Sequence, residues 1–491
     1  MLGVNEYIVT MTSWQPDLTG RSGPRYQALA EAIAEAVRTG ALAPGAKLPP
    51  QRELAWKLGV TVGTVGRAYA LAEEQQLVSG QVGRGTYVLE PGVLEPGALE
   101  LGARRVEPIE PQLDSAEQPG GIIDMTRNIP AVTGQAMALA HSLAAIGQRP
   151  GLNLMLDYMP VIGHRAYRVA GARWIERTGL EIPPERLMVV GGAQHALATA
   201  VVALARPGEA VLTEHITYHG VANAMRLAGA RPVGVAMDAE GALPASIDQA
   251  ARETGAKLVF LTPTIHSPTT ANMSEERRRA IAEVLRARDL VLIEDDVYGY
   301  LPEHRPPPIA ALVPERALYI SSTSKCLAPG LRMAWLGAPP ALFDRLADTL
   351  HAMALALPAF GAEIVTRWIA DGTADRLVKA LREETAARHA LAGTALAGLQ
   401  WRGRPDSMHA FVTLPDARPV AEFAAEAARR GIAICAAGDF AVDDTPAPNA
   451  FRIALGSTAT RPVMQRAVAT LAEMARTATA DSAVTMRRLA V

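Results

Sequence analysis

The chain has 491 residues, of which 49% are hydrophobic and 20% charged, and its formal net charge is −2. This length predicts more than one compact unit. The near-zero charge excludes a uniformly basic coat for nucleic acid, although it is compatible with a small module that reads DNA through local charge.

The N-terminal stretch MLGVNEYIVT lacks the basic and apolar regions of a secretory signal. No uncharged apolar run reaches the roughly 18–20 residues that span a bilayer. The only cysteines, Cys326 and Cys435, cannot build a disulfide framework or a zinc cluster, which fits a reducing compartment. We therefore expect a cytoplasmic protein with no membrane partner.

Residues 13–90 predict three helices followed by a hairpin. The segment PRYQALAEAIAEAVRTG carries apolar residues at helical spacing, and QRELAWKLG and TVGRAYALAEEQQL predict two more helices separated by a tight turn. LVSGQVGRGTYVLE predicts two short strands around a glycine-rich tip. This order is typical of a winged helix-turn-helix, and a three-helix bundle that binds no nucleic acid is the alternative.

The amino-acid sequence of this region favours a winged helix-turn-helix. GALAPGAKLPPQRELAWKLGVTVGTVGRAYALAEEQQLVSGQVGRGTYV resembles the GntR-type winged helix over its whole length. The resemblance implies binding to double-stranded DNA through Arg52, Thr64, Arg67 and Arg84. One departure is Val62, where the family usually has an arginine early in the recognition helix, so we expect base readout or affinity to differ.

Residues 91–121 predict an extended linker. A decaying five-residue repeat, LEPGVLEPGALELGA, begins at Leu89, and RRVEPIEPQLDSAEQPGG follows it. Because the segment is rich in proline and glutamate and lacks apolar periodicity, it cannot bury a core of its own. The linker separates residues 13–90 from a larger unit, residues 122–491.

The larger unit predicts an α/β fold. Apolar strand-like runs alternate with helical segments such as AQHALATAVVALARPG and SEERRRAIAEVLRARD; the runs are RLMVVG, AVLTE, RPVGVAM, KLVFLTP, LVLIED, ALYISS and MAWLGA. This alternation indicates a mostly parallel sheet covered on both faces. Ligands of such sheets bind beyond the C-terminal ends of the strands, so the residues that follow each run are the candidates for a site.

Four of these strand ends carry polar groups. GAQHAL opens a helix whose free N–H groups suit an anion, and HITYHG places Tyr218 where it could stack on a ring or simply pack. DDVY offers a carboxylate and a tyrosine, although paired acids also bind metals or cap turns. SSTSKCLAPGLR places Lys325 among hydroxyls, with Arg332 seven residues later. A solvated loop lysine is the alternative there.

Together these groups match one cofactor. Hydroxyls and a guanidinium suit a phosphate dianion, and a lysine that is buried beside a cation loses its proton more readily, as attack on an aldehyde requires. Pyridoxal 5'-phosphate (PLP) has the phosphate, the flat ring, the basic ring nitrogen and the aldehyde that the four strand ends would need. The scattered histidines His195, His215 and His219 show no ligand spacing and predict no metal site.

Nearly all of residues 122–491 resembles a fold-type I aminotransferase domain. The resemblance implies that Lys325 forms the Schiff base, that Asp295 faces the ring nitrogen and that Tyr298 binds the ring hydroxyl. Tyr218 would stack on the ring, and Arg452, in NAFRIALGS, would bind an effector carboxylate. The remaining residues would bind the phosphate, Tyr158 from the partner subunit: Gly192, Ala193, Gln194, Ser322, Ser324, Arg332 and Tyr158.

One departure concerns the ring hydroxyl. The family's Asn-Pro-Thr-Gly is Ser267-Pro268-Thr269-Thr270 in this chain, so the amide that usually helps to hold the hydroxyl is absent. His266, beside Ser267, either substitutes for the missing asparagine or is an exposed loop histidine. The departure weighs against full transaminase activity.

A GntR-type winged helix joined by a long linker to an aminotransferase-like domain resembles the MocR subfamily of bacterial transcription regulators. The resemblance implies a head-to-tail homodimer with two tethered DNA-binding heads. It also implies a regulator that senses PLP, or an amino compound reacting with PLP at Lys325. A working aminotransferase with an appended DNA-binding domain is the alternative, and a DNA-binding protein with an empty PLP fold is a third possibility.

Overall fold

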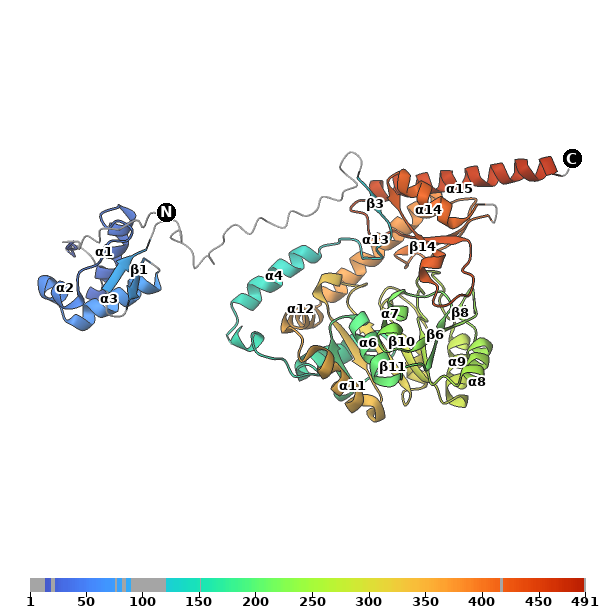
Figure 1. Ribbon diagram of the computed structural model, residues 1–491, viewed down its shortest axis with the longest axis horizontal. Helices are drawn as coiled ribbons and strands as arrows, with labels where there is room; N and C mark the ends of the chain where they lie inside the picture. The colour runs from blue at the N-terminus through green and yellow to red at the C-terminus, as the bar shows by residue number, and fades with distance from the viewer. Residues whose placement is uncertain are drawn as a thin grey trace, which may run out of the picture. The chain divides into compact units, whose positions relative to one another are not determined.

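The computed structural model describes residues 14–18, 23–75, 77–81, 85–89, 121–150, 152–415 and 418–489. The chain divides into two compact units, Met1–Glu110 and Pro111–Val491 (Figure 1). The boundaries 13–90, 91–121 and 122–491 stay predictions, because residues 90–120 lie outside the described residues.

The N-terminal unit contains the predicted three helices and hairpin. Its elements are α1 (Arg25–Arg38), α2 (Gln51–Leu58), α3 (Val62–Glu74), β1 (Val78–Gln81) and β2 (Gly85–Val88). The two strands pair antiparallel. Helix α2 ends at Gly59 with φ 64°, a left-handed conformation that glycine adopts without strain. The Thr61 side chain then accepts a hydrogen bond from the N–H of Thr64 at 3.2 Å and caps α3.

The larger unit is built on a seven-stranded sheet with the order β4-β12-β11-β10-β9-β5-β6. The strands are β4 (Leu187–Val190), β5 (Ala210–Glu214), β6 (Arg231–Val235), β9 (Leu258–Leu261), β10 (Val291–Asp295), β11 (Ala317–Ser322) and β12 (Ala334–Gly337). Only β12 runs antiparallel to its neighbours in this sheet. The prediction of a mostly parallel sheet is therefore confirmed.

Helices cover both faces of this sheet (Figure 1). In β4, Leu187 and Val189 join one apolar core while Met188 and Val190 join another, because alternate side chains of a strand point to opposite faces. The first core includes residues of α5 (Arg165–Ile175), α8 (Pro244–Thr254), α9 (Glu275–Ala287) and α12 (Ala359–Ala370). The second includes residues of α6 (Ala193–Leu204), α7 (Gly220–Leu227) and α11 (Pro340–Ala354).

A second, four-stranded sheet has the order β13-β14-β17-β16. Its strands are β13 (Gln400–Arg402), β14 (His409–Thr413), β16 (Cys435–Ala436) and β17 (Ala450–Ala454), and they pack with α13 (Thr373–Ala395), α14 (Val420–Arg429) and α15 (Arg461–Leu489). Beside it, β3 (Ile123–Asp124) pairs parallel with β15 (Ile432–Ala433). This pairing brings the start of the large unit to the C-terminal sheet.

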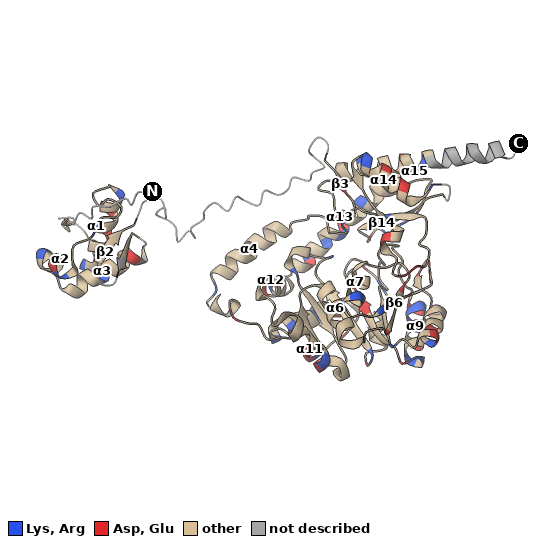
Figure 2. Ribbon diagram, in the orientation of Figure 1, with Lys and Arg blue, Asp and Glu red and all other residues tan. Residues whose placement is uncertain are grey.

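The remaining elements are short or lie outside the two sheets. They are α4 (Gln135–Gly147), α10 (Ile309–Leu312), β7 (Met237–Asp238), β8 (Gly241–Ala242) and the 3-10 turns η2 (Leu152–Met155), η3 (Glu176–Thr178), η4 (Pro184–Arg186), η5 (Pro329–Leu331) and η6 (Ala437–Phe440). Basic and acidic residues lie side by side on α9, whereas α4 carries no charged residue (Figure 2). No helix in the described ranges is long and apolar enough to cross a membrane.

Candidate functional site

Lys325 lies three residues beyond the end of β11, in a loop with defined hydrogen bonds. Thr323 donates to the Met333 carbonyl through its N–H at 3.2 Å and its hydroxyl at 2.9 Å. Lys325 Nζ donates to the backbone carbonyl of Asn128. The lysine is half-buried and held in place, so it is not the solvated loop lysine that the sequence left open.

The surroundings of Lys325 favour its neutral form. Burial, followed by the positive charges of Arg452, Arg332 and Arg127, lowers the pKa of Lys325 to about 8, while Asp295 acts in the opposite direction. A neutral amine is the form that attacks a carbonyl carbon. The site therefore prepares this lysine for bond formation with an aldehyde.

Asp295 ends β10 and is buried, with 6% of its surface exposed. Burial raises the pKa of Asp295 to about 7, although a backbone hydrogen bond from Val297 opposes the rise. Asp295 Oδ1 is buried without a hydrogen-bond partner among the described residues. A protonated ring nitrogen would supply that missing donor and positive charge.

Tyr298 lies one turn beyond Asp295 and is also buried. Its hydroxyl oxygen accepts a hydrogen bond from Asn128 Nδ2 at 2.9 Å. Burial raises the pKa of Tyr298 to about 12, so the hydroxyl keeps its proton. It can therefore donate to an oxygen on a ligand.

The turn between β4 and α6 has room for an anion. Gly192 has φ 99°, and a Cβ added there would lie 2.5 Å from Arg332 Nη2. Arg332 Nη2 donates to the Gly191 carbonyl at 3.0 Å. Since α6 begins at Ala193, the N–H groups of Ala193 and Gln194 have no helical carbonyl to bind. Free N–H groups beside a guanidinium suit a phosphate.

The hydroxyls of Ser322 and Ser324 lie at the same edge of the sheet. Ser322 is paired with Ala334, which is paired in turn with Val190 at the end of β4. The two serine hydroxyls are 3.1 Å apart. The predicted phosphate ligands therefore come from neighbouring strand ends, although they are far apart in sequence.

The side chains of Tyr218 and Gln194 both lie close to the Cα atom of Gly220. A Cβ at Gly220 would lie 2.0 Å from Gln194 Oε1 and 2.2 Å from Tyr218 Cε1. Burial and then the negative charge of Asp295 raise the pKa of Tyr218, while Arg332 lowers it. Tyr218 is therefore within electrostatic reach of both predicted ends of the cofactor.

Arg452 lies in the middle of β17 and is 5% exposed. Its Nη1 donates to Ser267 Oγ at 3.2 Å, its Nη2 donates to the Thr126 carbonyl, and it stacks on the Phe440 ring at 4.8 Å. None of the described acidic side chains forms an ion pair with Arg452, and its Nε is buried without a partner. A buried guanidinium without a counter-ion is a natural place for a ligand carboxylate.

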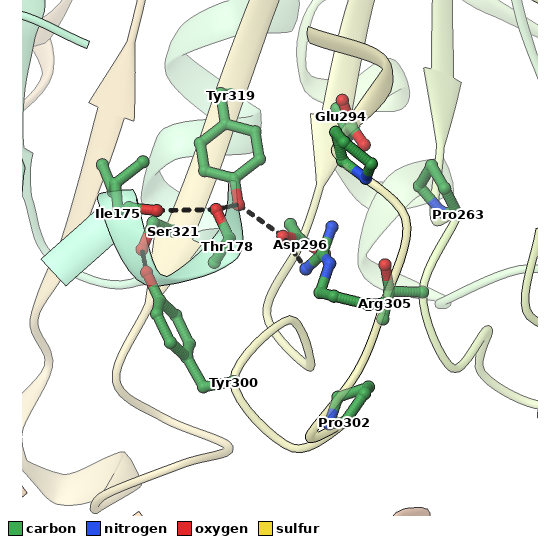
Figure 3. A network of polar contacts seen from close by, with 12 residues as sticks. Ile175, Thr178, Pro263, Glu294, Asp296, Tyr300, Pro302, Arg305, Tyr319 and Ser321 are labelled. Atoms are coloured by element: carbon green, nitrogen blue, oxygen red, sulfur yellow. Dashed lines mark hydrogen bonds and ion pairs between the residues drawn. The ribbon is translucent and has the colours of Figure 1, made fainter. Parts of the chain in front are cut away.

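A polar network around Asp296, Arg305 and Tyr319 lies beside the end of β10 (Figure 3). Alternation along the strand directs Glu294 and Asp296 away from Asp295. Arg305 Nη1 lies 2.5 Å from Asp296 Oδ2, and the Tyr319 hydroxyl donates to the same oxygen. These contacts fix the strand end on which Asp295 is placed.

Some site residues were not predicted from the sequence. Asn128 and His409 contact each other at 3.0 Å beside Tyr298, yet neither belongs to a local motif. His266 is 1% exposed, and its Nδ1 lies 2.8 Å from Thr269 Oγ1, so of the two alternatives the exposed loop histidine is wrong. Tyr158 is 77% exposed, and its contact with a partner subunit stays a prediction.

In the N-terminal unit, Arg52 on α2 and Arg67 on α3 are exposed, and Thr64 is half-buried beside Thr61. Val62, the first residue of α3, is 45% exposed. Arg84 lies outside the described residues. Arg52, Thr64 and Arg67 are thus accessible to DNA.

Comparison with known proteins agrees with this geometry. Residues 25–88 match the family model of bacterial regulatory proteins of the gntR family, and residues 123–471 match that of aminotransferase class I and II. The HTH-type transcriptional regulator YdeF of Bacillus subtilis (strain 168) is 28% identical over 452 residues, which cover 92% of this chain and 94% of the relative. YjiR of Escherichia coli (strain K12), named likewise, is 28% identical over 67% of this chain and 72% of its own.

Among solved structures, the multiple substrate aminotransferase from Thermococcus profundus superposes with a TM-score of 0.68 at 23% identity, covering 79% of this chain and 98% of that one. This likeness shows the fold. The residues at the strand ends fit PLP, since they offer a lysine whose pKa is lowered, a buried carboxylate with one unpartnered oxygen and an anion-binding turn. The chain belongs to the aminotransferase class I and II family, and with its GntR-type head it is a MocR-like transcription regulator whose large domain uses pyridoxal 5'-phosphate.

Proposed function

We propose that the large domain is a sensor in which an amino compound carrying a carboxylate binds between Lys325 and Arg452 and thereby changes DNA binding. The observation that carries this proposal is the buried guanidinium of Arg452, which has no counter-ion among the described side chains. Arg452 Nη2 donates to the carbonyl of Thr126 and Lys325 Nζ to that of Asn128, two residues later, so both cations border the same short segment, where one small ligand could contact both.

The bound cofactor supplies an aldehyde that combines reversibly with amines and a ring that withdraws electrons. Lys325 provides the amine that holds it, Asp295 the negative charge for its ring nitrogen and Tyr298 the donor for its ring hydroxyl. Tyr218 would stack on the ring. The phosphate ligands of this chain are Gly192, Ala193, Gln194, Ser322, Ser324 and Arg332.

A head-to-tail dimer is part of the proposal. Helix α4 has no charged residue (Figure 2). Several large apolar side chains on and around it are exposed: Val132 82%, Met137 82%, Leu143 48%, Leu156 78% and Tyr158 77%. Exposed apolar residues in such numbers are typical of a surface that a partner covers. A second copy of the chain would cover them and would bring Tyr158 to the partner's phosphate site.

Each subunit would bring one DNA-binding head, which contacts DNA through Arg52, Thr64, Arg67 and Arg84. Two linked heads raise the effective concentration of the second DNA contact without any new interface. The ligand can shift the dimer only by the difference in its affinity for the two states.

The test combines visible absorbance with DNA binding. PLP-loaded protein is titrated with a panel of amino acids and amines, and the same samples are assayed on an operator selected from random-sequence DNA. We expect an absorbance band that Lys325→Ala abolishes, and at least one carboxylated amine that shifts the band and changes DNA affinity.

Two results would contradict the sensor. If none of the compounds that shift the absorbance band changes the DNA affinity, ligand binding in the large domain does not control the DNA-binding domain. Steady loss of the aldehyde form of the cofactor, reversed by a keto acid, would instead identify a working aminotransferase.

A further inference from the structure

Position 267 cannot supply an amide to the ring hydroxyl. Ser267 Oγ accepts a hydrogen bond from Arg452 Nη1 at 3.2 Å, and Ser267 is 6% exposed. A serine is shorter than an asparagine and offers a single hydrogen. Either the ring hydroxyl has Tyr298 as its sole directed donor, or another residue takes over the task of the amide.

Asn128 brings an amide to the same tyrosine from a different part of the chain. It lies just beyond β3, is 7% exposed, and donates through Nδ2 to the Tyr298 hydroxyl at 2.9 Å. Since that oxygen accepts from Asn128, the hydroxyl hydrogen of Tyr298 is free to point elsewhere. The same Nδ2 lies 3.0 Å from His409 Nδ1.

His409 determines which way the Asn128 amide faces. His409 Nε2 lies 3.2 Å from the carbonyl oxygen of His266, which can only accept, so Nε2 carries the proton and Nδ1 must accept. The Ser407 hydroxyl donates to the His409 carbonyl at 2.8 Å and therefore leaves Nδ1 to Asn128. Nδ1 thus selects the NH₂ group of Asn128.

The orientation leaves one group of Asn128 unused. Its two N–H bonds go to Tyr298 and His409, and its Oδ1 is buried with no partner in the described part of the chain. An unpaired buried carbonyl is unfavourable in isolation. Because the backbone carbonyl of the same residue accepts from Lys325 Nζ, the residue borders the place where the cofactor joins the lysine.

We propose that Asn128, oriented by His409, is a positioning residue that compensates for the amide missing at position 267 by directing the Tyr298 hydroxyl to the ring oxygen of PLP. The inference depends on the proposed role of Tyr298. It deepens the proposed function by naming the residues that adjust the charge of the ring oxygen.

The experiment measures the pH midpoint of the visible spectral transition of the PLP-loaded full chain. When the Lys325 nitrogen loses its proton, the negative charge on the ring oxygen of PLP is no longer compensated by a neighbouring positive charge. Hydrogen-bond donors to the ring oxygen stabilise that charge, so they lower the pH at which the nitrogen loses its proton. We expect Asn128→Ala to raise the midpoint by about one pH unit, a tenfold change in proton affinity. Asn128→Leu keeps the branching at Cγ without the hydrogen-bonding groups and gives a second measurement if the alanine variant does not fold.

Two further variants separate a directed role from general disturbance. His409→Leu is expected to raise the midpoint by a smaller amount in the wild-type background and by nothing in the Asn128→Ala background, because it acts only through Asn128. Ser267→Asn introduced into the Asn128→Ala variant returns an amide donor for the ring oxygen and is expected to lower the midpoint again.

The inference is overturned if the midpoint of Asn128→Ala stays within about 0.2 units of wild type, or if His409→Leu acts equally in both backgrounds. A failed rescue by Ser267→Asn contradicts the amide replacement specifically. The measurement needs neither DNA nor an amino compound, so failure of the sensor proposal leaves it intact, and its own failure leaves the sensor proposal standing.

Discussion

Replacement of Arg305 by methionine tests whether the ion pair behind Asp295 stabilises the large unit. The Arg305 and Asp296 side chains are 6% and 0% exposed, and their charged atoms are 2.5 Å apart. Removing one partner of a buried pair leaves the other charge uncompensated, which lowers the free energy of unfolding by about 3–5 kcal/mol. The Tyr319 hydroxyl still donates to Asp296 in the variant, so we expect the lower end, about 3 kcal/mol.

Two companion variants make this expectation specific. The double variant Arg305→Met with Asp296→Asn leaves no unpaired buried charge, so its loss should fall well below the sum of the two single losses. The matched control is Arg279→Met, because Arg279 pairs with Glu275 on α9 with both side chains more than half exposed, at 62% and 54%. We expect a change below about 0.5 kcal/mol for the control.

The assay is urea unfolding followed by near-UV circular dichroism. Trp174 stacks on Tyr300 with ring centroids 4.6 Å apart, so this signal reports on the large unit. A loss for Arg305→Met no larger than that for Arg279→Met would refute the reasoning. A double variant that loses the full sum would refute it as well, because the effect would then not come from an unpaired charge.

Three further predictions follow from the site and the DNA head. Because the pKa of Lys325 is lowered to about 8, its neutral form accumulates as pH rises to that value, so the rate of PLP capture followed by absorbance should rise up to about pH 8 and then level off. Gly192→Ala places a Cβ 2.5 Å from Arg332 Nη2 and should weaken PLP binding at least about tenfold in a titration. Val62→Arg adds a cation to the exposed start of α3 and should steepen the salt dependence of DNA affinity by about one phosphate contact.

The predictions that succeeded concern features encoded over short stretches of sequence. The strands of the large sheet could be read from apolar runs; Asp295 ends β10 with Tyr298 three residues later, and Lys325 and Arg332 lie on the connection between β11 and β12. Since parallel strands end at one edge of a sheet, their proximity follows once the strands are known.

Asn128 and His409 could not be found in this way. Asn128 is 197 residues from Lys325, whose Nζ donates a hydrogen bond to the Asn128 backbone carbonyl. It is 281 residues from His409. They meet because the chain after β3 runs beside the C-terminal sheet, where the Ala454 N–H donates to the Met125 carbonyl and Ala454 is paired with His409 on the next strand. No local pattern specifies such a contact between distant segments.

The proposed route from ligand to DNA begins at a contact that Arg452 already makes. Arg452 Nη2 donates to the carbonyl of Thr126, two residues after β3, the first described strand after residues 90–120. A ligand carboxylate would compete with that carbonyl for one guanidinium, which gives the two states a difference in ligand affinity. An amine without a carboxylate should therefore shift the visible band but leave DNA affinity unchanged, whereas its amino acid counterpart changes both. Equal DNA responses to the two compounds would locate the trigger at Lys325 instead.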